Sequence, residues 1–145
     1  MNEQAVVSDC RMLAFTIRDD ASGSLASLER LGECPLDVQR ALVFSNVPLG
    51  ASRGAHANMH TPELVICAAG ALTLRVEDGR SSRSIPMSSQ AGAALVPATL
   101  WMELRDFAPG TVVIILADSD NGEPQHANIH EHARWLRTRG MSHVA

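Results

Sequence analysis

Three polar residues that could carry chemistry stand at alternate positions near the middle of the chain: His56, Asn58 and His60. Alternate residues of a β-strand point to the same side, so a strand over residues 56–60 would place all three on one face. Imidazole gives and takes protons readily near neutral pH, whereas an amide only donates and accepts hydrogen bonds. The spacing therefore predicts a site for proton transfer or ligand binding, to which Glu63 adds a nearby carboxylate.

The wider spacing around these residues resembles the first motif of the cupins, a class of small β-barrels. Between Gly50 and Gly70 it reads Gly, five residues, His-x-Asn, four residues, Glu, six residues, Gly. In a metal-binding cupin, two His and the Glu of this motif hold a divalent ion together with a later His. Here Asn58 replaces the second His, and Trp101 or Met102 stands where the later His is expected. We therefore predict neither a bound metal nor another cofactor.

The composition fits one globular domain and excludes several classes of protein. The chain has 145 residues, a formal net charge of −4 and 46% hydrophobic residues, enough to bury a core of its own. This acidic balance, without a basic run, argues against a protein that binds nucleic acid or a membrane surface. The longest apolar stretch, residues 64–74, is too short to span a bilayer, and no signal-peptide pattern begins the chain. Three cysteines without metal-type spacing favour a reduced, cytoplasmic protein.

Short apolar runs separated by turn residues predict an all-β fold, a cupin-type double-stranded β-helix or jelly-roll barrel. Asp78-Gly79 predicts a type I′ hairpin turn, because Asp-Gly suits its two central positions. The strands expected from the alternating runs are residues 11–18, 24–28, 40–45, 56–60, 64–69, 71–77, 80–85, 93–96, 100–105 and 111–117.

The C-terminal region has a different pattern. Apolar residues between Ile129 and Arg139 recur at helical spacing, so we expect a helix at about 129–139, with Gly140 as its stop. The chain then forms a single cupin domain over residues 1–145. Its N-terminal strands are expected at about 10–30 and its barrel at about 38–118.

Beyond the barrel motif, the sequence resembles one family, the cupin-type 3,4-ketoisomerases of dTDP-4-keto-6-deoxyhexoses, which contain the WxcM-like C-terminal domain. The resemblance covers roughly residues 20–136. It implies a metal-free enzyme that moves a ketone through an enediol in deoxysugar biosynthesis. It also implies a nucleotide-sugar ligand and a homodimer that can exchange N-terminal strands. The segments that carry it are Gly23-Ser24-Leu25, Gln39-Arg40, Arg53 to Ala57, Val65 to Cys67, Glu77 to Gly79, Trp101-x-Glu103 and Asp106-Phe107.

The chain departs from the family pattern at three polar positions. The family reads His-Ala-His where this chain reads His56-Ala57-Asn58. It reads Trp-His-Glu where this chain reads Trp101-Met102-Glu103. A tyrosine of the family falls near Leu42, and this chain contains no tyrosine. Two of the imidazoles and one phenol expected around the sugar are therefore replaced.

The remaining residues suggest which side chain would perform each step of the reaction. We assign acid–base catalysis to His56, and to Asn58 a hydrogen bond to the enediolate oxygen, because an amide cannot titrate. A forked guanidinium suits a diphosphate, so the resemblance implies substrate binding by Arg53 and Arg40. The other predicted substrate-binding residues are His60, Glu63, Trp101 and Glu103.

Each of these residues also has a structural explanation that the sequence leaves open. His56 fits a core histidine bonded to backbone, Trp101 a core or pocket-wall aromatic, and Asn58 a cap on backbone groups. His60 fits an exposed loop. Salt bridges would account for Arg40, Arg53 and Glu63, and a solvated helix face for His126, His130 and His132.

Two other functions stay open beside the isomerase. One is a non-catalytic cupin that binds a nucleotide sugar or another small ligand. The other is a different cupin enzyme that uses His56, His60 and Glu63, with or without a metal. The isomerase is the first hypothesis, because the resemblance extends over most of the chain and not over one motif alone.

Overall fold

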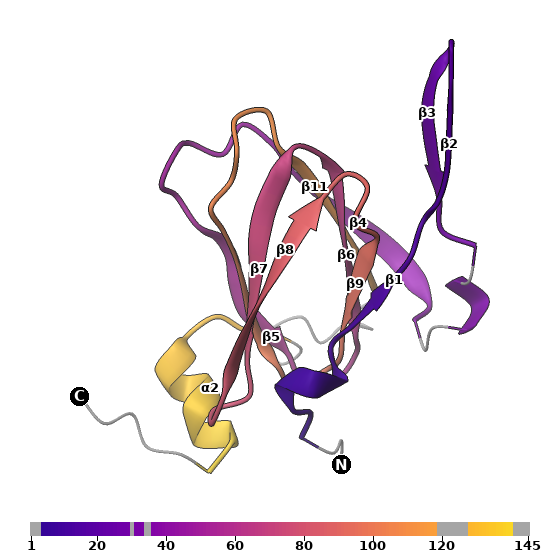
Figure 1. Ribbon diagram of the computed structural model, residues 1–145. Helices are drawn as coiled ribbons and strands as arrows, with labels where there is room; N and C mark the ends of the chain where they lie inside the picture. Colours follow the sequence, from indigo (N-terminus) through magenta and orange to yellow (C-terminus); the bar gives the residue numbers. More distant parts are fainter. Residues whose placement is uncertain (1–3, 30, 34–35, 119–127, 141–145) are drawn as a thin grey trace.

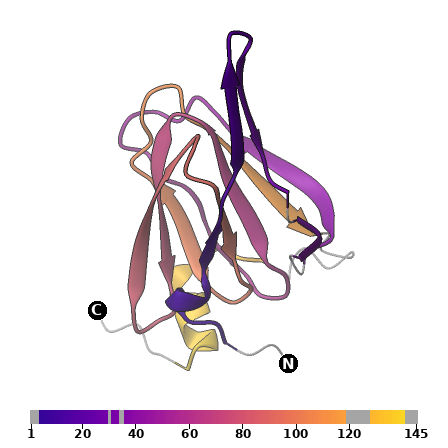
Figure 2. The same ribbon diagram turned by 45° about the vertical axis from the view of Figure 1, so that its right-hand side comes forward.

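Two five-stranded antiparallel sheets face each other and form a barrel in the computed structural model, which describes residues 4–29, 31–33, 36–118 and 128–140 (Figure 1). A separate two-stranded hairpin stands away from the barrel, as the turned view in Figure 2 also shows. A short helix lies at the base of the barrel, beside the second sheet (Figure 1). The predicted all-β jelly-roll barrel with a short C-terminal helix is confirmed.

Hydrogen bonds between neighbouring strands set the order of the strands in each sheet. The first sheet consists, in this order, of β1 (Arg11–Leu13), β9 (Ala93–Val96), β6 (Glu63–Ala69), β11 (Val112–Asp118) and β4 (Val38–Phe44). The second consists of β12 (Asn128–Ile129), β5 (Arg53–Asn58), β10 (Trp101–Arg105), β7 (Ala71–Glu77) and β8 (Ser82–Ser88). The hairpin is β2 (Thr16–Asp20) and β3 (Gly23–Ser27), and the helical elements are the 3-10 helices η1 (Val7–Asp9) and η2 (Leu31–Glu33) and the helix α2 (His132–Thr138).

Alternate residues of the strands fill the space between the two sheets. In β7, Leu72, Leu74 and Val76 are buried, while the residues between them are only partly covered. This strict alternation is why the sequence predicted the bounds of β7 without error; those of β9, whose four residues are all buried, were also predicted correctly. The register of β10 pairs Met102 with Val76, so Met102 also faces the core.

The N-terminal strand predicted over residues 11–18 is wrong as a single strand. Residues 11–13 form β1, which pairs with β9 in the barrel, whereas residues 16–20 form β2, which pairs only with β3. The chain therefore leaves the barrel after Leu13. Leu13, Phe15 and Ile17 keep the same alternation across the break, so periodicity alone does not reveal it.

The turn after β7 also differs from the prediction. A type I′ turn needs a positive φ at both central residues, but only Gly79 has one (94°), and Asp78 does not. Glu77 pairs with Ser82, which leaves a four-residue loop between them. The Asp78 carboxylate accepts hydrogen bonds from the backbone N–H groups of Arg80 (2.9 Å) and Ser81 (2.8 Å), and these bonds fix the loop.

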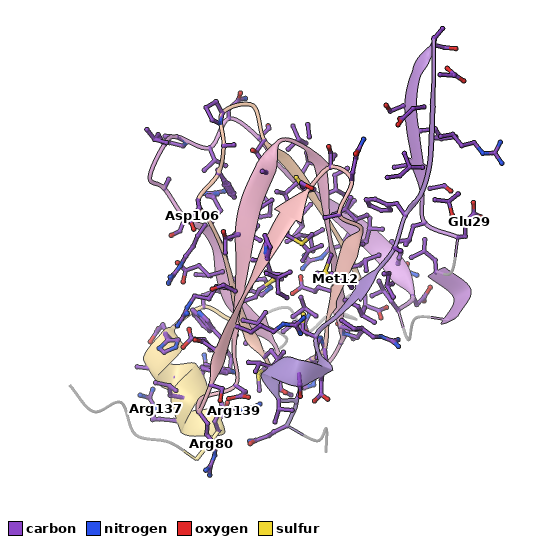
Figure 3. All side chains as sticks on the ribbon, viewed as in Figure 1. Met12, Glu29, Arg80, Asp106, Arg137 and Arg139 are labelled. Carbon is purple, nitrogen blue, oxygen red and sulfur yellow. The ribbon has the colours of Figure 1, made fainter. Side chains whose placement is uncertain are left out.

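The C-terminal helix begins later than the sequence predicted. α2 starts at His132, and residues 128–129 instead form β12, whose Ile129 pairs with Ala57 of β5. Just after α2, the Arg139 guanidinium (labelled in Figure 3) donates to the backbone oxygen of Asp78 at 2.9 Å. This bond ties the end of the helix to the loop at the base of the second sheet.

Gly70, which closes the predicted motif, offers a test of the barrel's packing. It has a φ of 80°, and a Cβ atom there would lie 2.3 Å from Oγ1 and 2.8 Å from Cα of Thr111. We expect Gly70→Ala to lower the free energy of unfolding by about 2–3 kcal/mol, because the backbone strain and the clash add. Urea unfolding monitored by tryptophan fluorescence measures the loss.

Gly110 provides the matched control for that experiment. Its φ of 77° is nearly the same as that of Gly70, but a Cβ there would meet nothing within 4 Å. Gly110→Ala should therefore cost only the conformational strain, about 1 kcal/mol. Equal losses in the two variants would show that the contact with Thr111 does not matter.

Candidate functional site

A cavity of about 320 Å³ lies between the two sheets of the barrel. Strands β4, β5, β6 and β11 and the residue after β12 contribute to its wall. An apolar wall with a few convergent polar groups is typical of a site for a small molecule. The apolar side chains are Leu42, Phe44, Ala55 and Ile115, and the polar ones are Arg40, Arg53, His56, Glu63 and His130.

The centre of the polar wall is a buried pair, His56 of β5 and Glu63 of β6. Only 7% of His56 and 3% of Glu63 is exposed. The imidazole Nε2 lies 2.5 Å from Glu63 Oε1, and Nδ1 lies 2.5 Å from the backbone oxygen of Gly54. A carboxylate and a carbonyl both accept hydrogen bonds, so the ring serves as donor at both nitrogens. The surroundings therefore stabilise the imidazolium form.

The pKa of His56 reflects opposing effects. Burial lowers the pKa, but the hydrogen bond and the charge of Glu63, together with the Gly54 carbonyl, raise it, and the charge of Arg40 lowers it. The net result is a pKa above the ordinary 6.5. A raised pKa favours the protonated ring, which can donate its proton and then accept one, and this suits acid–base catalysis.

The second oxygen of Glu63 has a different environment from the first. Oε2 is buried, and among the described residues it has no hydrogen-bond partner. Glu63 nevertheless lines the cavity. A buried carboxylate oxygen without a partner is costly, and the pairing of Oε1 with His56 offsets part of that cost.

Arg40 and Arg53 bring positive charge to the same cavity from β4 and β5. Both are exposed, and the guanidinium carbon of Arg53 lies 5.4 Å from the ring centroid of Phe44. Stacking on a ring positions the guanidinium and leaves its N–H groups free to bind an anion. The cavity can therefore accept a negatively charged ligand.

Asn58 lies on the same strand as His56, but the contacts of its carboxamide oxygen are structural. This oxygen accepts hydrogen bonds from the backbone N–H groups of His60 and Thr61, both at 3.1 Å. β5 ends at Asn58, so the strand predicted to reach His60 is wrong at its end. His60 lies in the exposed bend that follows and is not part of the cavity wall.

Trp101 and Glu103 lie on the other face of β10. Met102 pairs with His56 and points inward, so its two neighbours point outward. The Trp101 ring packs 5.9 Å from that of Trp135 in α2. Glu103 pairs with Arg105 at 2.8 Å, and this hydrogen bond is the main reason that the pKa of Glu103 is lowered. Neither residue lines the cavity, so their predicted contact with a ligand has no support from the geometry.

His130 is a cavity residue for which the sequence favoured a solvated helix face. It follows β12 directly, and its ring centroid lies 6.0 Å from that of His56. Helical periodicity hid the short strand that brings it there. The only indication in the sequence was the apolar Ile129. It is buried in the cluster that contains Ala57, its partner in β5, and its neighbour His130 therefore points to the opposite side, towards the cavity. Of the two other histidines of that cluster, His132 begins α2 and His126 lies outside the described residues.

Neither a metal cluster nor a membrane span is found in the described part of the chain. No group of three or more His, Cys, Asp or Glu side chains there could hold a metal ion. No described helix is long and apolar enough to cross a membrane.

A jelly-roll barrel of two antiparallel sheets with a ligand-sized cavity between them is the architecture of the cupins, which share the jelly roll with viral capsid and lectin domains. Comparison with protein families gives the next level of detail. The family described as FdtA: WxcM-like, C-terminal matches residues 8–137, and the chain belongs to this family.

Individual relatives agree with this assignment. A TDP-4-oxo-6-deoxy-α-D-glucose 3,4-oxoisomerase from Aneurinibacillus thermoaerophilus is 26% identical over 98 residues, which is 68% of this chain and 70% of the relative. A solved 3,4-ketoisomerase from Helicobacter canadensis is 27% identical, with a TM-score of 0.80 over 91% of this chain and 98% of the other. A sugar 3,4-ketoisomerase from Thermoanaerobacterium thermosaccharolyticum shares the fold at 19% identity, with a TM-score of 0.82 over 93% and 97% of the two chains.

Proposed function

We propose that this protein is a 3,4-ketoisomerase that acts on a dTDP-linked 4-keto-6-deoxyhexose in deoxysugar biosynthesis. The observation that carries the proposal is the buried His56–Glu63 pair in a cavity that also contains Arg40 and Arg53. Membership of the WxcM-like family supports the reaction class. The relative from Aneurinibacillus thermoaerophilus, named for a TDP-4-oxo-6-deoxyglucose, supports the substrate class.

The reaction moves a ketone between neighbouring carbons by proton transfer alone. A base removes the proton from C3, and the C3–H electron pair forms a double bond to C4 while O4 gains negative charge. The proton of the C3 hydroxyl then passes to O4, and C4 receives a proton as C3 becomes the ketone. No electrons leave the sugar, so acid–base groups and hydrogen-bond donors are sufficient.

The site residues fit these requirements as follows. The His56–Glu63 pair supplies the acid–base groups and is held in place by the barrel. Asn58 does not line the cavity, so its proposed role as a donor to the enediolate oxygen is the least supported, and it would require the amide N–H₂, because the amide oxygen already binds two backbone groups. Arg40 and Arg53 would bind the diphosphate, and the apolar wall would pack against the deoxy sugar.

Conversion and binding assays on the same sample test this function. Purified protein is mixed with dTDP-4-keto-6-deoxyglucose, and the 3-keto product is followed by NMR while calorimetry measures the binding of dTDP. We expect both conversion and binding. Binding without conversion would favour the non-catalytic cupin, and the absence of both would refute a dTDP-sugar site. A metal analysis of the active sample tests the different cupin enzyme.

The assembly is part of the same proposal. We expect a homodimer in which the β2-β3 hairpins of two chains pack against, or exchange with, each other. Every residue of β2 is exposed, and Leu25 of β3 is 60% exposed. An isolated two-stranded hairpin is only marginally stable in water, so contact with a second chain would stabilise this one. Between this hairpin and Ile66 of β6 lies a cavity of about 420 Å³, in which Phe15 and Ile17 form an apolar wall.

Changing the apolar surface of the hairpin tests the dimer. We expect Leu25→Glu to shift the mass measured by light scattering from two chains towards one, because a buried unpaired charge is costly. Ser22→Glu at the exposed tip of the hairpin is the control and should leave the mass unchanged. A wild-type protein that is already monomeric would contradict the proposed assembly.

We also propose a cytoplasmic location. Cys10 and Cys67 are free and buried, which fits a reducing compartment. Burial raises the pKa of Cys10 to about 11, against the smaller effect of Arg83, so this thiol is unreactive.

A further inference from the structure

We propose that His130 is a second acid–base residue of the site, which delivers a proton to C4 of the sugar while His56 takes the proton from C3. This assignment rests on the proposed isomerase function and divides its two proton transfers at carbon between two imidazoles. The sequence indicated His56 as the acid–base residue and favoured a solvated helix face for His130.

The pairing of β12 with β5 places His130 beside His56. The register pairs Ile129 with Ala57, so one further step along both strands brings His130 level with His56. Side chains directly opposite each other in an antiparallel pair lie close together on the same face. The two ring centroids are 6.0 Å apart, with 32° between the ring planes, and both residues line the cavity. A sugar bound in this cavity is therefore within reach of both imidazoles.

The two imidazoles differ in their access to water. His56 is only 7% exposed, and its ring nitrogens contact Glu63 and the backbone oxygen of Gly54. His130 is exposed and belongs to the cavity wall, so its ring can take up a proton from water between turnovers. Imidazole accepts and donates protons readily near neutral pH. His130 can therefore bring a solvent proton to the bound sugar, a task for which a buried ring is less suited.

The other polar residues of the cavity wall do not fit the donor role. Arg40 and Arg53 keep their protons, so their guanidinium groups bind anions and do not deliver protons. Glu63 is almost fully covered, with Oε1 paired to His56 and Oε2 buried. Among the described residues that line the cavity, His130 is therefore the titratable side chain left to serve C4.

The proton transfers balance with the two imidazoles in these roles. Neutral His56 takes the proton from C3, the C3–H electron pair becomes the C3=C4 bond, and the C4=O4 pair moves to O4. Glu63 and the Gly54 carbonyl stabilise the imidazolium that forms. The hydroxyl proton passes from O3 to O4. Protonated His130 then gives its proton to C4, where the C3=C4 pair forms the new C4–H bond, and a pair on O3 forms the C3 ketone. Exchange with water returns both rings to their starting states.

Deuterium labelling in the His130→Gln variant tests the assignment, because glutamine keeps a polar side chain but cannot titrate. Each protein is incubated with dTDP-4-keto-6-deoxyglucose in deuterated water. NMR follows exchange at C3, formation of the 3-keto product and the label at C4, and wild-type product should carry deuterium at C4. In His130→Gln we expect product formation to fall by roughly 10²-fold, while C3 exchange stays within about fivefold of the wild type, because His56 still takes and returns the C3 proton.

A neighbouring histidine supplies the matched control. His132 lies two residues further along the chain and outside the cavity wall, with its Nε2 3.4 Å from Glu77 Oε2. The variant His132→Gln should therefore match the wild type in both C3 exchange and product formation. Calorimetry with dTDP separates catalysis from binding, and we expect His130→Gln to bind the nucleotide as tightly as the wild type.

Three outcomes would overturn the role of His130 and leave the isomerase standing. The first is product formation by His130→Gln within about fivefold of the wild type. The second is wild-type product that carries the original C3 proton at C4, which would show that one base serves both carbons. The third is a parallel loss of dTDP binding, C3 exchange and product formation in His130→Gln, which would identify a binding residue. A wild type with neither C3 exchange nor product would instead overturn the isomerase, and this assignment with it.

Discussion

We expect His56→Ala to lower kcat by roughly 10²–10³-fold, because the substitution removes the imidazole to which we assign acid–base catalysis. The same change leaves a buried carboxylate without its partner, which should destabilise the fold by about 3–5 kcal/mol. Steady-state kinetics with dTDP-4-keto-6-deoxyglucose, at a temperature where circular dichroism shows a folded variant, measures the first effect.

His56→Gln separates the charge from the hydrogen bond. Glutamine can still donate to Glu63 Oε1, so we expect this variant to be more stable than His56→Ala but also slow. If His56→Gln were as active as the wild type, the positive charge would have no part in the reaction. Retention of full activity by His56→Ala would exclude the whole pair from catalysis.

A second large effect is expected at Trp135, the largest fully buried side chain of the described residues. Its ring packs against Trp101 and Ile129, and its Nε1 donates to the backbone oxygen of Thr99 at 2.8 Å. Trp135→Ala should lower the free energy of unfolding by about 3–5 kcal/mol, because it leaves a large cavity behind β5 and β10. Chemical denaturation provides the measurement.

Two further variants in α2 show which part of the Trp135 side chain accounts for that loss of stability. Trp135→Phe removes the indole N–H but keeps most of the ring, so we expect a loss of about 1–2 kcal/mol. Arg134→Ala changes an exposed neighbour and should alter stability by less than about 0.5 kcal/mol. A small loss in Trp135→Ala, comparable with that of Arg134→Ala, would mean that α2 does not stabilise the barrel.

The sequence predicted the barrel because its strands alternate and its turns carry clear signals. β7 and β9 have the predicted bounds, since each lies between two short turns and has a buried core face. The spacing of His56 and Glu63 predicted a common site, and the two side chains do meet across consecutive strands of opposite sheets.

The features that the sequence did not predict depend on contacts between segments that are distant in the chain. The break between β1 and β2 comes from the change of pairing partner, which the local alternation does not record. His130 reaches the cavity only because β12 pairs with β5, which lies far earlier in the chain. Burial by Trp135 explains why Trp101 faces α2 and not a ligand. Tertiary contacts of this kind override a local pattern.

The protonation state of His56 could not be predicted from the sequence for a related reason. Histidine and glutamate both suit acid–base catalysis, and the sequence shows only that His56 and Glu63 are close. The protonation state depends on the two contacts of the ring, with Glu63 Oε1 and with the backbone oxygen of Gly54. Gly54 has a positive φ of 69°, and the glycine itself is the only local signal in the sequence for this backbone conformation.

Deuterium incorporation at C3 tests the proposed isomerase most directly. Wild-type protein is incubated with dTDP-4-keto-6-deoxyglucose in deuterated water, and the C3 proton signal is followed by NMR beside a sample without protein. We expect the C3 signal to disappear faster with protein, as the signals of a 3-keto sugar appear. Bound sugar that keeps its C3 proton as long as the control would contradict the proposed function.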